Sequence, residues 1–300
     1  MDEVKPIFEP RKVILIGSGV IREKVGMTSP QLFRSVVYNM KKFFSGETYV
    51  LDVDGKDRYD NLKRLSGIPE LVIIMLPPKQ SIVHAEKGAK SGVKALVIIT
   101  GGYRNQQRQQ LLKLREEYGV RILGPNTIMG VINTSNGLNT TFERNVMPKK
   151  GNIAVISQSG GVGACILDWA CFYNIGISKF AFMGDKIDVD DVDLLRYLGR
   201  DKHTRVICLY MEGIKNGREF IEEARKIVGK KPIPALKGGI TQESAQRAKS
   251  HTASIAGSDK IFDAAFKKAG IIRVETIEEL MDAAVALSKQ PPMRGDNVAI

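Results

Sequence analysis

The fold is decided by a short apolar run that ends in glycine, Val13-Ile-Leu-Ile-Gly-Ser-Gly19. An unbroken aliphatic run bounded by turn residues is typical of a strand that is buried on both faces. The same pattern returns in Leu71–Pro78, which ends in two prolines, and in Ala95–Gly102, which ends in two glycines. These runs predict the central strands of a parallel sheet.

Amphipathic segments separate the predicted strands. Helical spacing is found in Leu32–Phe44, Ser81–Ser91 and Asn105–Tyr118, and further strands are expected at Thr48–Val53 and Arg121–Leu123. This alternation predicts an α/β fold with helices on both faces of the sheet. The glycines and prolines directly follow strands, so they lie at the carboxyl edge, where open α/β sheets bind ligands.

The same rhythm restarts after residue 150 and predicts a second doubly wound domain. Strands are expected at Ile153–Ile156, Ile177–Phe182, Val206–Met211, Ile233–Leu236 and Ile271–Arg273, and helices at Gly161–Tyr173, Asp190–Leu198, Arg218–Val228, Ala253–Ala269 and Ile277–Leu287. Residues 133–151 show no strong period and are expected to connect the domains. We therefore predict domains at residues 1–145 and 151–290. Residues 291–300 are expected to be a linker and the start of a truncated further domain.

The chain of 300 residues is basic, with 45 Lys and Arg against 33 Asp and Glu and a formal net charge of +12. Its basic residues are dispersed, usually beside acidic ones, and no run pairs them with aromatic residues as single-strand binders do. Nucleic acid is therefore not expected as a partner. The positive charge suits the attraction of polyphosphate ligands.

Targeting and metal-binding signals are not found in the sequence. No apolar run reaches the roughly 20 residues that a spanning helix needs, and Met1–Pro6 does not open like a signal peptide. A cytoplasmic protein without membrane contact is expected.

The three cysteines are odd in number and lack CxxC spacing, which argues against a disulfide framework. With only three histidines, a metal-ligand cluster is hard to assemble, so no metal site is predicted.

The first glycine-rich turn predicts a site for a phosphate-bearing ligand. Gly17 and Gly19 follow a strand and precede a helix, so the backbone can approach a phosphate closely. The strict dinucleotide pattern has a third glycine at the position of Arg22, while Asp52 or Asp54 stands where a ribose-binding acid belongs. A nicotinamide dinucleotide therefore stays open beside another phosphate-bearing ligand.

A second strand-to-helix turn, Ser157-Gln-Ser-Gly-Gly161, is rich in small hydrogen-bond donors. Hydroxyls and glycine N–H groups at a helix start form a cradle for an oxyanion or a phosphate. A nucleophilic Ser159 is an alternative, but the nucleophile-elbow pattern needs glycine where this chain has Ser157.

His251 lies in Lys249–Asp259, a small, polar turn directly ahead of a helical pattern. A helix start supplies N–H groups and a positive dipole end, which suit a phosphate carried on a histidine. Glu212 follows the strand Val206–Met211, where a carboxylate can accept the N–H of a histidine and leave the other nitrogen free to attack phosphorus. From the residues alone, a surface histidine and a solvated acid remain the alternatives.

Together these segments resemble the NDP-forming acyl-CoA synthetases, above all the alpha subunit of ADP-forming acetyl-CoA synthetase, and more distantly the succinyl-CoA ligase alpha subunits. The resemblance runs from about residue 11 to residue 300. It rests on the order and spacing of Val13–Gly17, Leu123–Asn126, Ile156–Gly161, Asp188–Asp190, Met211–Gly213, Ala235–Gly238 and Ser250–Ser258.

The resemblance implies a Rossmann-like CoA-binding domain followed by a flavodoxin-like doubly wound domain that carries a phosphohistidine. The phosphohistidine would be His251 and its supporting glutamate Glu212. Phosphate and the acyl group would be held by Ser157, Gln158, Ser159, Gly160 and Gly161. Coenzyme A would contact Gly17, Ser18, Lys24, Val25, Gly26, Lys56, Pro77, Pro78, Gly101, Gly102 and Asn126.

The implied activity is that of an ADP-forming acid–thiol ligase. Acyl-CoA, ADP and phosphate would interconvert with acid, ATP and coenzyme A through an acyl phosphate and phospho-His251. An ATP-grasp beta-type partner would bind ADP or ATP and Mg²⁺, so a hetero-oligomer is expected, with a small carboxylic acid and phosphate as further ligands.

Two departures from the family pattern are visible. Val53-Asp-Gly-Lys56 stands where the family commonly has Val-Asn followed by lysine, and the third domain of the acetyl-type alpha subunit is expected to be missing after Ile300. A non-catalytic module that senses CoA or acyl-CoA stays open, although the presence of both His251 and Glu212 argues against it. A nicotinamide-dependent dehydrogenase is favoured only by the first glycine-rich turn and Asp52.

Overall fold

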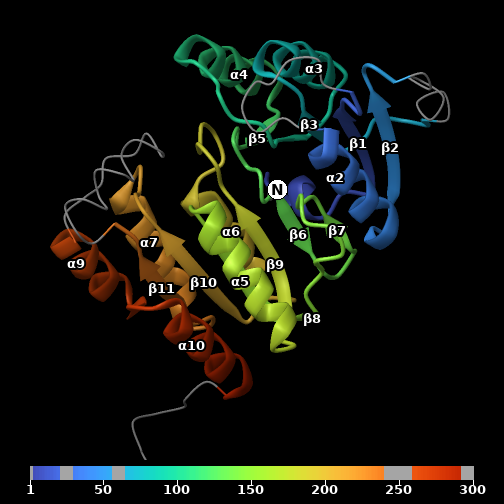
Figure 1. Ribbon diagram of the computed structural model, residues 1–300. Helices are drawn as coiled ribbons and strands as arrows, with labels where there is room; N and C mark the ends of the chain where they lie inside the picture. Colours follow the sequence, from blue (N-terminus) through green and yellow to red (C-terminus); the bar gives the residue numbers. More distant parts are fainter. Residues whose placement is uncertain (1–2, 21–29, 56–64, 240–258, 292–300) are drawn as a thin grey trace, which may run out of the picture.

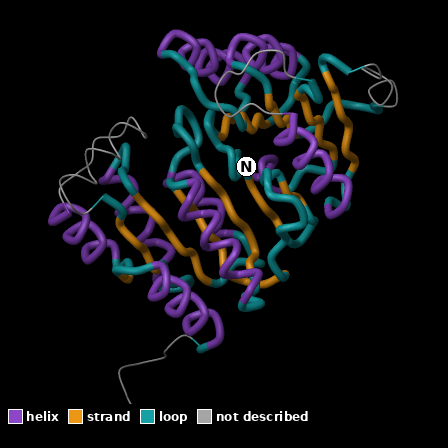
Figure 2. The backbone as a smooth tube through the Cα atoms, viewed as in Figure 1, coloured by secondary structure: helices purple, strands orange, loops and turns teal. Residues whose placement is uncertain are grey.

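Helices cover both faces of the two sheets that the chain forms (Figures 1 and 2). The computed structural model describes residues 3–20, 30–55, 65–239 and 259–291. The α/β architecture expected from the alternation of apolar runs and amphipathic segments is confirmed. Within these ranges, no helix is both long enough and apolar enough to cross a membrane.

The first sheet has five strands, all parallel, in the order β2-β1-β3-β4-β5. They are β1 (Lys12–Gly17), β2 (Glu47–Asp52), β3 (Leu71–Met75), β4 (Ala95–Ile98) and β5 (Arg121–Leu123). Successive side chains of β3 point to opposite faces, and all of them are buried, which explains why the run has no polar alternation. One face is covered by α1 (Lys5–Phe8) and α2 (Pro30–Phe43), and the other by α3 (Pro78–Lys90) and α4 (Asn105–Tyr118).

The second sheet has seven strands in the order β12-β11-β10-β8-β9-β6-β7. Its parallel strands are β8 (Lys150–Ser157), β9 (Ile177–Phe182), β10 (Val206–Met211), β11 (Pro234–Lys237) and β12 (Ile272–Val274). One face packs against α5 (Gly160–Phe172) and α10 (Ile277–Lys289), and the other against α6 (Asp191–Arg200), α7 (Gly217–Val228) and α9 (Asp259–Ala269).

A short hairpin differs from the expectation that residues 133–151 only connect two domains. Strand β6 (Val131–Asn133) pairs antiparallel with β9, and β7 (Leu138–Asn139) pairs antiparallel with β6. Strands of this length are too short to show a period of two in the sequence. Their asparagines hold the chain around them, since Asn133 Nδ2 donates to Phe8 O at 2.9 Å and Asn139 Nδ2 donates to Val146 O at 2.8 Å. Residues before 145 therefore contribute to both sheets.

A single hydrophobic cluster extends from the first sheet into the second. It includes Phe33 of α2 and Ile156 of β8. The ring of Phe8 stacks on Tyr197 of α6, with centroids 4.8 Å apart and planes 7° from parallel. The Tyr197 hydroxyl also donates to Glu9 Oε1 at 2.8 Å. The two sheets thus share buried surface.

Candidate active site

Gly17 and Ser18, predicted to contact coenzyme A, lie where β1 ends at the carboxyl edge of the first sheet. A Cβ built on Gly17 would lie 2.2 Å from Cδ2 of Phe33, so glycine allows the ring to pack over the strand end. Ser18 is buried, and its Oγ donates to Asp54 Oδ2 at 2.7 Å and accepts from Val20 N at 3.1 Å. Four further predicted contacts lie outside the described residues and stay predictions: Lys24, Val25, Gly26 and Lys56.

The carboxylate of Asp52 holds the turn after β1. Its Oδ1 accepts from Gly19 N at 3.1 Å and from Asp54 N at 3.2 Å. A Cβ built on Gly19 would lie 2.6 Å from Oδ2, so the carboxylate is packed against the glycine backbone. At the position where a dinucleotide site has its ribose-binding acid, this chain has a turn-forming acid. The geometry argues against the dehydrogenase alternative.

The other predicted contacts for coenzyme A follow the neighbouring strands of the same sheet. Pro77 is the N-cap of α3 and Pro78 its first residue. Gly101 and Asn126 pack closely together, and a Cβ on Gly101 would lie only 2.7 Å from Asn126 Oδ1. Gly102 has a φ of +84°, which favours glycine, and nothing lies within 4 Å of where its Cβ would be. The structure therefore brings together the ends of β3, β4 and β5 as the sequence predicted.

The turn from β8 into α5 places two hydroxyls at a helix start. Ser159 is the N-cap of α5, and its Oγ accepts from Val162 N at 3.4 Å. Ser157 Oγ accepts from Ser159 N at 3.2 Å and donates to Ser159 O at 2.7 Å. Gly160 and Gly161 open the helix, where amides have no acceptor within the helix, and a Cβ on Gly161 would meet nothing within 4 Å. This turn has the donors and the open space that a phosphate needs.

Gln158 departs from its expected role as a ligand for phosphate or the acyl group. Its side chain is buried, and both lone pairs of Oε1 and both N–H bonds of Nε2 are used within the protein. Oε1 accepts from Glu212 N at 2.7 Å and from Gly213 N at 2.9 Å. Nε2 donates to Asp191 Oδ1 at 2.6 Å and to Gly213 O at 2.9 Å. The amide therefore supports the loop at Glu212, and a direct contact with phosphate would require these bonds to break.

Glu212 directly follows β10 and is half-buried. Burial first, and then the charge of Glu212 and a hydrogen bond with it, raise the pKa of the Tyr210 hydroxyl to about 12. Burial lowers the pKa of Lys237, against the opposing charges of Asp259 and Glu212. A hydroxyl donor and an ammonium group thus both lie within electrostatic reach of the Glu212 carboxylate. His251 lies outside the described residues, so its pairing with Glu212 stays a prediction.

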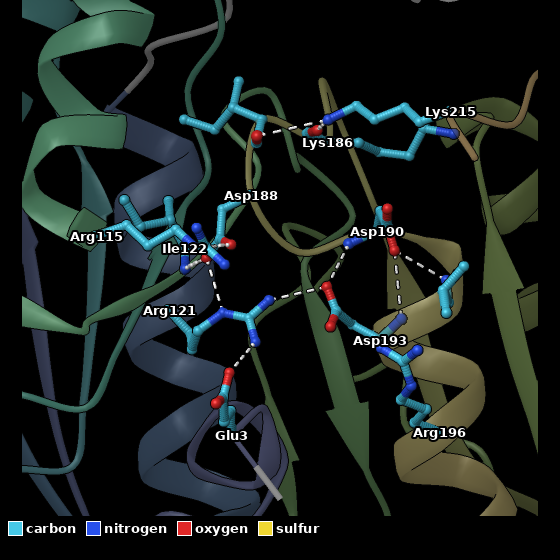
Figure 3. A network of polar contacts seen from close by, with 12 residues as sticks. Glu3, Arg115, Arg121, Ile122, Lys186, Asp188, Asp190, Asp193, Arg196 and Lys215 are labelled. Atoms are coloured by element: carbon cyan, nitrogen blue, oxygen red, sulfur yellow. Dashed lines mark hydrogen bonds and ion pairs between the residues drawn. The ribbon is translucent and has the colours of Figure 1, made fainter. Parts of the chain in front are cut away.

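A charged network that the sequence patterns did not single out joins the two sheets (Figure 3). Arg121 of β5 donates to Asp188 Oδ2 at 3.0 Å, Asp193 Oδ2 at 2.8 Å and Glu3 Oε2 at 2.8 Å. Burial lowers the pKa of the Arg121 guanidinium, but its hydrogen bonds and ion pairs with Asp188 and Asp193 outweigh burial and raise the pKa overall. Asp188 belongs to one of the motifs on which the family resemblance rests, and that motif was the signal in the sequence that could have identified it. No sequence pattern indicated that Arg121 is its partner.

The same loop between β9 and α6 also contacts the predicted CoA edge. Asp185 Oδ2 accepts from Arg108 Nη2 at 2.6 Å, and its Oδ1 accepts from Asn126 Nδ2 at 3.3 Å. The backbone N–H of Asp185 donates to Pro125 O at 2.8 Å. The next residue, Lys186, donates instead to Gly213 O at 2.9 Å, beside Glu212. The loop therefore reaches from the first sheet to the candidate active site.

A hollow of about 970 Å³ lies at the amino end of β8, between α5 and α10, and its lining contains none of the predicted site residues. Among the residues that the structure describes, no three His, Cys, Asp or Glu side chains are grouped so that they could hold a metal ion.

Two family models match the chain. Residues 46–133 match a model described as a CoA binding domain, and these residues include most strands of the first sheet. Residues 150–287 match a model described as a Succinyl-CoA ligase like flavodoxin domain, which covers the parallel strands of the second sheet.

Known proteins match across both sheets. Acetate–CoA ligase (ADP-forming) II subunit alpha from Pyrococcus furiosus is 39% identical over 307 residues, covering 98% of this chain and 64% of that protein. A structure of a "dinucleotide forming" acetyl-coenzyme A synthetase 1 from Ca. Korarchaeum cryptofilum, in complex with phosphate and ADP, superposes with a TM-score of 0.84. It is 32% identical and covers 97% of this chain and 63% of that one. Succinate–CoA ligase (ADP-forming) subunit alpha 2 from Archaeoglobus fulgidus is more distant, at 26% identity over 65% of this chain.

The chain thus spans less than two thirds of the length of the Pyrococcus and Korarchaeum proteins. The expected order, a CoA-binding domain followed by a flavodoxin-like ligase domain, is confirmed by the two family models. Together with the identity over nearly the whole chain, this shows that the protein belongs to the family of the ADP-forming acetyl-CoA synthetases, as a relative of their alpha subunits.

Proposed function

We propose that this chain is the alpha-type subunit of an ADP-forming acyl-CoA synthetase. The reaction interconverts acyl-CoA, ADP and inorganic phosphate with the free acid, ATP and coenzyme A. One observation carries the proposal: Glu212 and the helix start at Ser157–Gly161 share a sheet edge, because β8 and β10 are parallel neighbours. Membership of a family whose Pyrococcus relative is named an acetate–CoA ligase supports it.

In the first half-reaction, a phosphate oxygen attacks the thioester carbonyl of acyl-CoA. The carbon–sulfur bond breaks, the sulfur leaves as the thiolate and takes up a proton, and an acyl phosphate forms. The amides of Gly160 and Gly161 and the hydroxyl of Ser159 hold the phosphate oxygens, and the dipole of α5 stabilises their charge. The Ser157 hydroxyl, expected to bind phosphate, is buried and donates to Ser159 O, so it holds the turn instead. Coenzyme A extends across the strand-end turns of the first sheet.

In the second half-reaction, an imidazole nitrogen of His251 attacks the phosphorus of the acyl phosphate. The bond from phosphorus to the acyl oxygen breaks, and the carboxylate leaves. Glu212 accepts a hydrogen bond from the other ring nitrogen and offsets the positive charge that develops on the ring. Tyr210, whose pKa is raised to about 12, keeps its proton at neutral pH and donates a hydrogen bond to Glu212.

The nucleotide step is assigned to a partner protein. Phospho-His251 passes its phosphoryl group to ADP on an ATP-grasp beta-type subunit, which binds the nucleotide and Mg²⁺. A hetero-oligomer follows, and the designation of the Pyrococcus relative as a subunit alpha supports it. The acid is a small carboxylic acid, and the complex works in the cytoplasm.

Radiolabelled acetyl phosphate tests the proposal directly. The wild-type chain should take up label that is acid-labile and base-stable, as expected for phosphorus bonded to nitrogen. His251→Asn should abolish labelling while calorimetry still detects coenzyme A binding. Glu212→Gln should slow labelling roughly ten- to a hundredfold, because a neutral amide loses a charge-assisted hydrogen bond of about 1.5–3 kcal/mol.

Three results would count against this function. Label on Ser157 or Ser159, found by peptide mapping, would indicate a serine nucleophile. Full labelling of the His251→Asn protein would exclude the phosphohistidine. A wild-type chain that binds coenzyme A but takes no label from acetyl phosphate would favour the non-catalytic sensing module.

A further inference from the structure

A buried ion pair braces each end of α6. At its start, Lys186 Nζ lies 3.0 Å from Asp191 Oδ2, and at its end Lys179 Nζ lies 2.6 Å from Asp201 Oδ2. All four side chains are at most 4% exposed. Buried ion pairs are often no more stabilising than apolar residues of the same volume, so stability alone is a weak reason for either pair. The pairs differ in what they reach next.

The pair at the start of α6 continues into the amide of Gln158. Asp191 uses Oδ2 for Lys186 and Oδ1 for Gln158 Nε2, at 2.6 Å. An ionised carboxylate can only accept, so it forces the NH₂ end of the amide to face Asp191. The oxygen of Gln158 must then face the opposite way, towards the loop that carries Glu212. Asp191 is the first residue of α6, so the same carboxylate lies at the start of that helix.

The Gln158 oxygen fixes the backbone on both sides of Glu212. It accepts from Glu212 N at 2.7 Å and from Gly213 N at 2.9 Å, so the two peptide units that flank the Glu212 Cα are bound to one atom. The next carbonyl, Gly213 O, accepts from Gln158 Nε2 and from Lys186 Nζ, each at 2.9 Å. With both flanking peptides held, φ and ψ of Glu212 are restricted, and so is the direction of its side chain.

Lys186 is itself held in an uncommon conformation. Its φ of +50° lies in the left-handed region, which few residues other than glycine adopt. Its carbonyl accepts from Lys215 Nζ, and both residues are labelled in Figure 3. The side chain is thereby directed inward, to Asp191 and Gly213, instead of outward to solvent.

We propose that Lys186, Asp191 and Gln158 form a positioning relay that sets the direction of the Glu212 carboxylate for the phosphohistidine step. The inference rests on the proposed function, since it assigns these residues to the same site. They act through Glu212, so they are positioning residues and not catalytic ones. The pair Lys179–Asp201 has the same chemistry and burial without a link to Gln158 or Glu212, and serves as the matched control.

The test compares Gln158→Met and Lys186→Met with Lys179→Met in the full chain. Gln158→Met and Lys186→Met should both accelerate hydrogen exchange at the amides of Glu212 and Gly213 about tenfold or more. The first variant removes the oxygen that accepts from these amides, and the second disturbs the orientation of that oxygen. Their labelling by radiolabelled acetyl phosphate should slow roughly ten- to a hundredfold while coenzyme A binds as before. Lys179→Met should leave exchange at these amides and labelling unchanged, although it removes an equally buried charge.

A rescue separates positioning from general damage. Adding Asp191→Asn to Lys186→Met removes the stranded carboxylate charge and keeps a carbonyl that accepts from Gln158 Nε2. The double variant should therefore regain part of the amide protection and labelling, because an amide at position 191 can accept from Gln158 Nε2 but does not force that orientation as a carboxylate does. A Gln158→Met chain that exchanges and labels like the wild type would overturn the relay, and so would an equal loss in Lys179→Met. Failure of the proposed function appears separately, as a wild-type chain that takes no label at His251.

Discussion

Buried polar atoms differ in whether the fold supplies them with a partner. Every hydrogen-bonding position of the Gln158 amide is used, whereas the buried hydroxyl of Tyr103 has no partner in the part of the chain that the structure describes. Burial raises the pKa of Tyr103 to about 12, against weaker opposing effects of the Ser81 and Thr100 hydroxyls. Burying a hydroxyl without a hydrogen-bond partner costs about 1–3 kcal/mol relative to leaving it hydrogen-bonded to water. The hydroxyl of Tyr103 therefore offsets part of the stability that burial of its ring contributes.

Replacing Tyr103 by Phe tests this cost. At pH 8 the variant should be about 1 kcal/mol more stable in urea unfolding, because the unpaired hydroxyl is gone. In the wild type, the folded-state pKa of Tyr103 lies above that of the unfolded chain, so stability present below pH 10 is lost as the pH rises towards 12. The advantage of Tyr103→Phe should grow by roughly 1 kcal/mol per pH unit above pH 10. Tyr173→Phe, at an exposed tyrosine, is the control and should change neither value.

At the scale of an element, α6 is held at its first turn by reciprocal capping. Asp190 Oδ1 accepts from Val192 N at 2.9 Å and Asp193 N at 3.3 Å, and Asp193 Oδ2 accepts from Asp190 N at 3.2 Å. Burial, and then the charge of Asp193, raise the pKa of Asp190. The cap therefore satisfies helix amides but places like charges close together. The same turn begins with Asp191, so the cap also positions the relay.

Substitutions at Asp190 separate these two effects. Asp190→Ala should lower the unfolding free energy by about 0.5–2 kcal/mol, because the first-turn amides lose their acceptor. Asp190→Asn keeps an acceptor without the charge and should be at least as stable as the wild type at pH 7. Because the folded-state pKa of Asp190 is raised, ionisation reduces stability as the pH rises through it, so the advantage of Asn should vanish in acid. Urea unfolding that ranks Asn with Ala would show that the charge itself holds the cap.

At the scale of the whole molecule, the two sheets are joined by an apolar cluster and by a charged one. The apolar cluster includes the stacked rings of Phe8 and Tyr197. In the charged one, Arg121, whose side chain is 7% exposed, pairs with Asp188, whose side chain is 2% exposed. Because the shared core crosses between the sheets, the chain should unfold in one cooperative transition.

Arg121→Met should therefore destabilise the entire protein. It removes one of the two arginines that pair with the buried Asp188 and leaves Arg115 as the other, so the loss should approach but not exceed the roughly 3–5 kcal/mol that breaking a buried ion pair costs. Arg196→Met is the matched control, since Arg196 is 37% exposed and its ion pair with Glu219 is worth about 1 kcal/mol or less. Differential scanning calorimetry should show one transition that shifts far more for Arg121→Met. Equal shifts would mean that the network does not join the two halves.

Much of the fold and part of the site could be predicted from the sequence because their signals are local. The buried run of β3 and the glycines after β1 and β4 identify a parallel sheet and its carboxyl edge within a few neighbouring residues. The order of motifs then indicated the family, and the helix start at Ser157–Gly161 formed as expected. Hydrophobic periodicity and turn chemistry are properties of consecutive residues, so they are readable without a structure.

Tertiary structure decided which polar groups meet. Gln158 reaches Glu212 across 54 residues, and Arg121 reaches Asp188 across 67, and neither pair has a periodic or turn-like signature. The place of the β6–β7 hairpin in the second sheet was likewise decided by tertiary structure, because β6 pairs with β9, which lies more than 40 residues further along the chain. A polar side chain can form a hydrogen bond or ion pair with almost any complementary group, so the sequence around it does not specify which group it meets. The partner is set by the geometry in which the apolar elements pack.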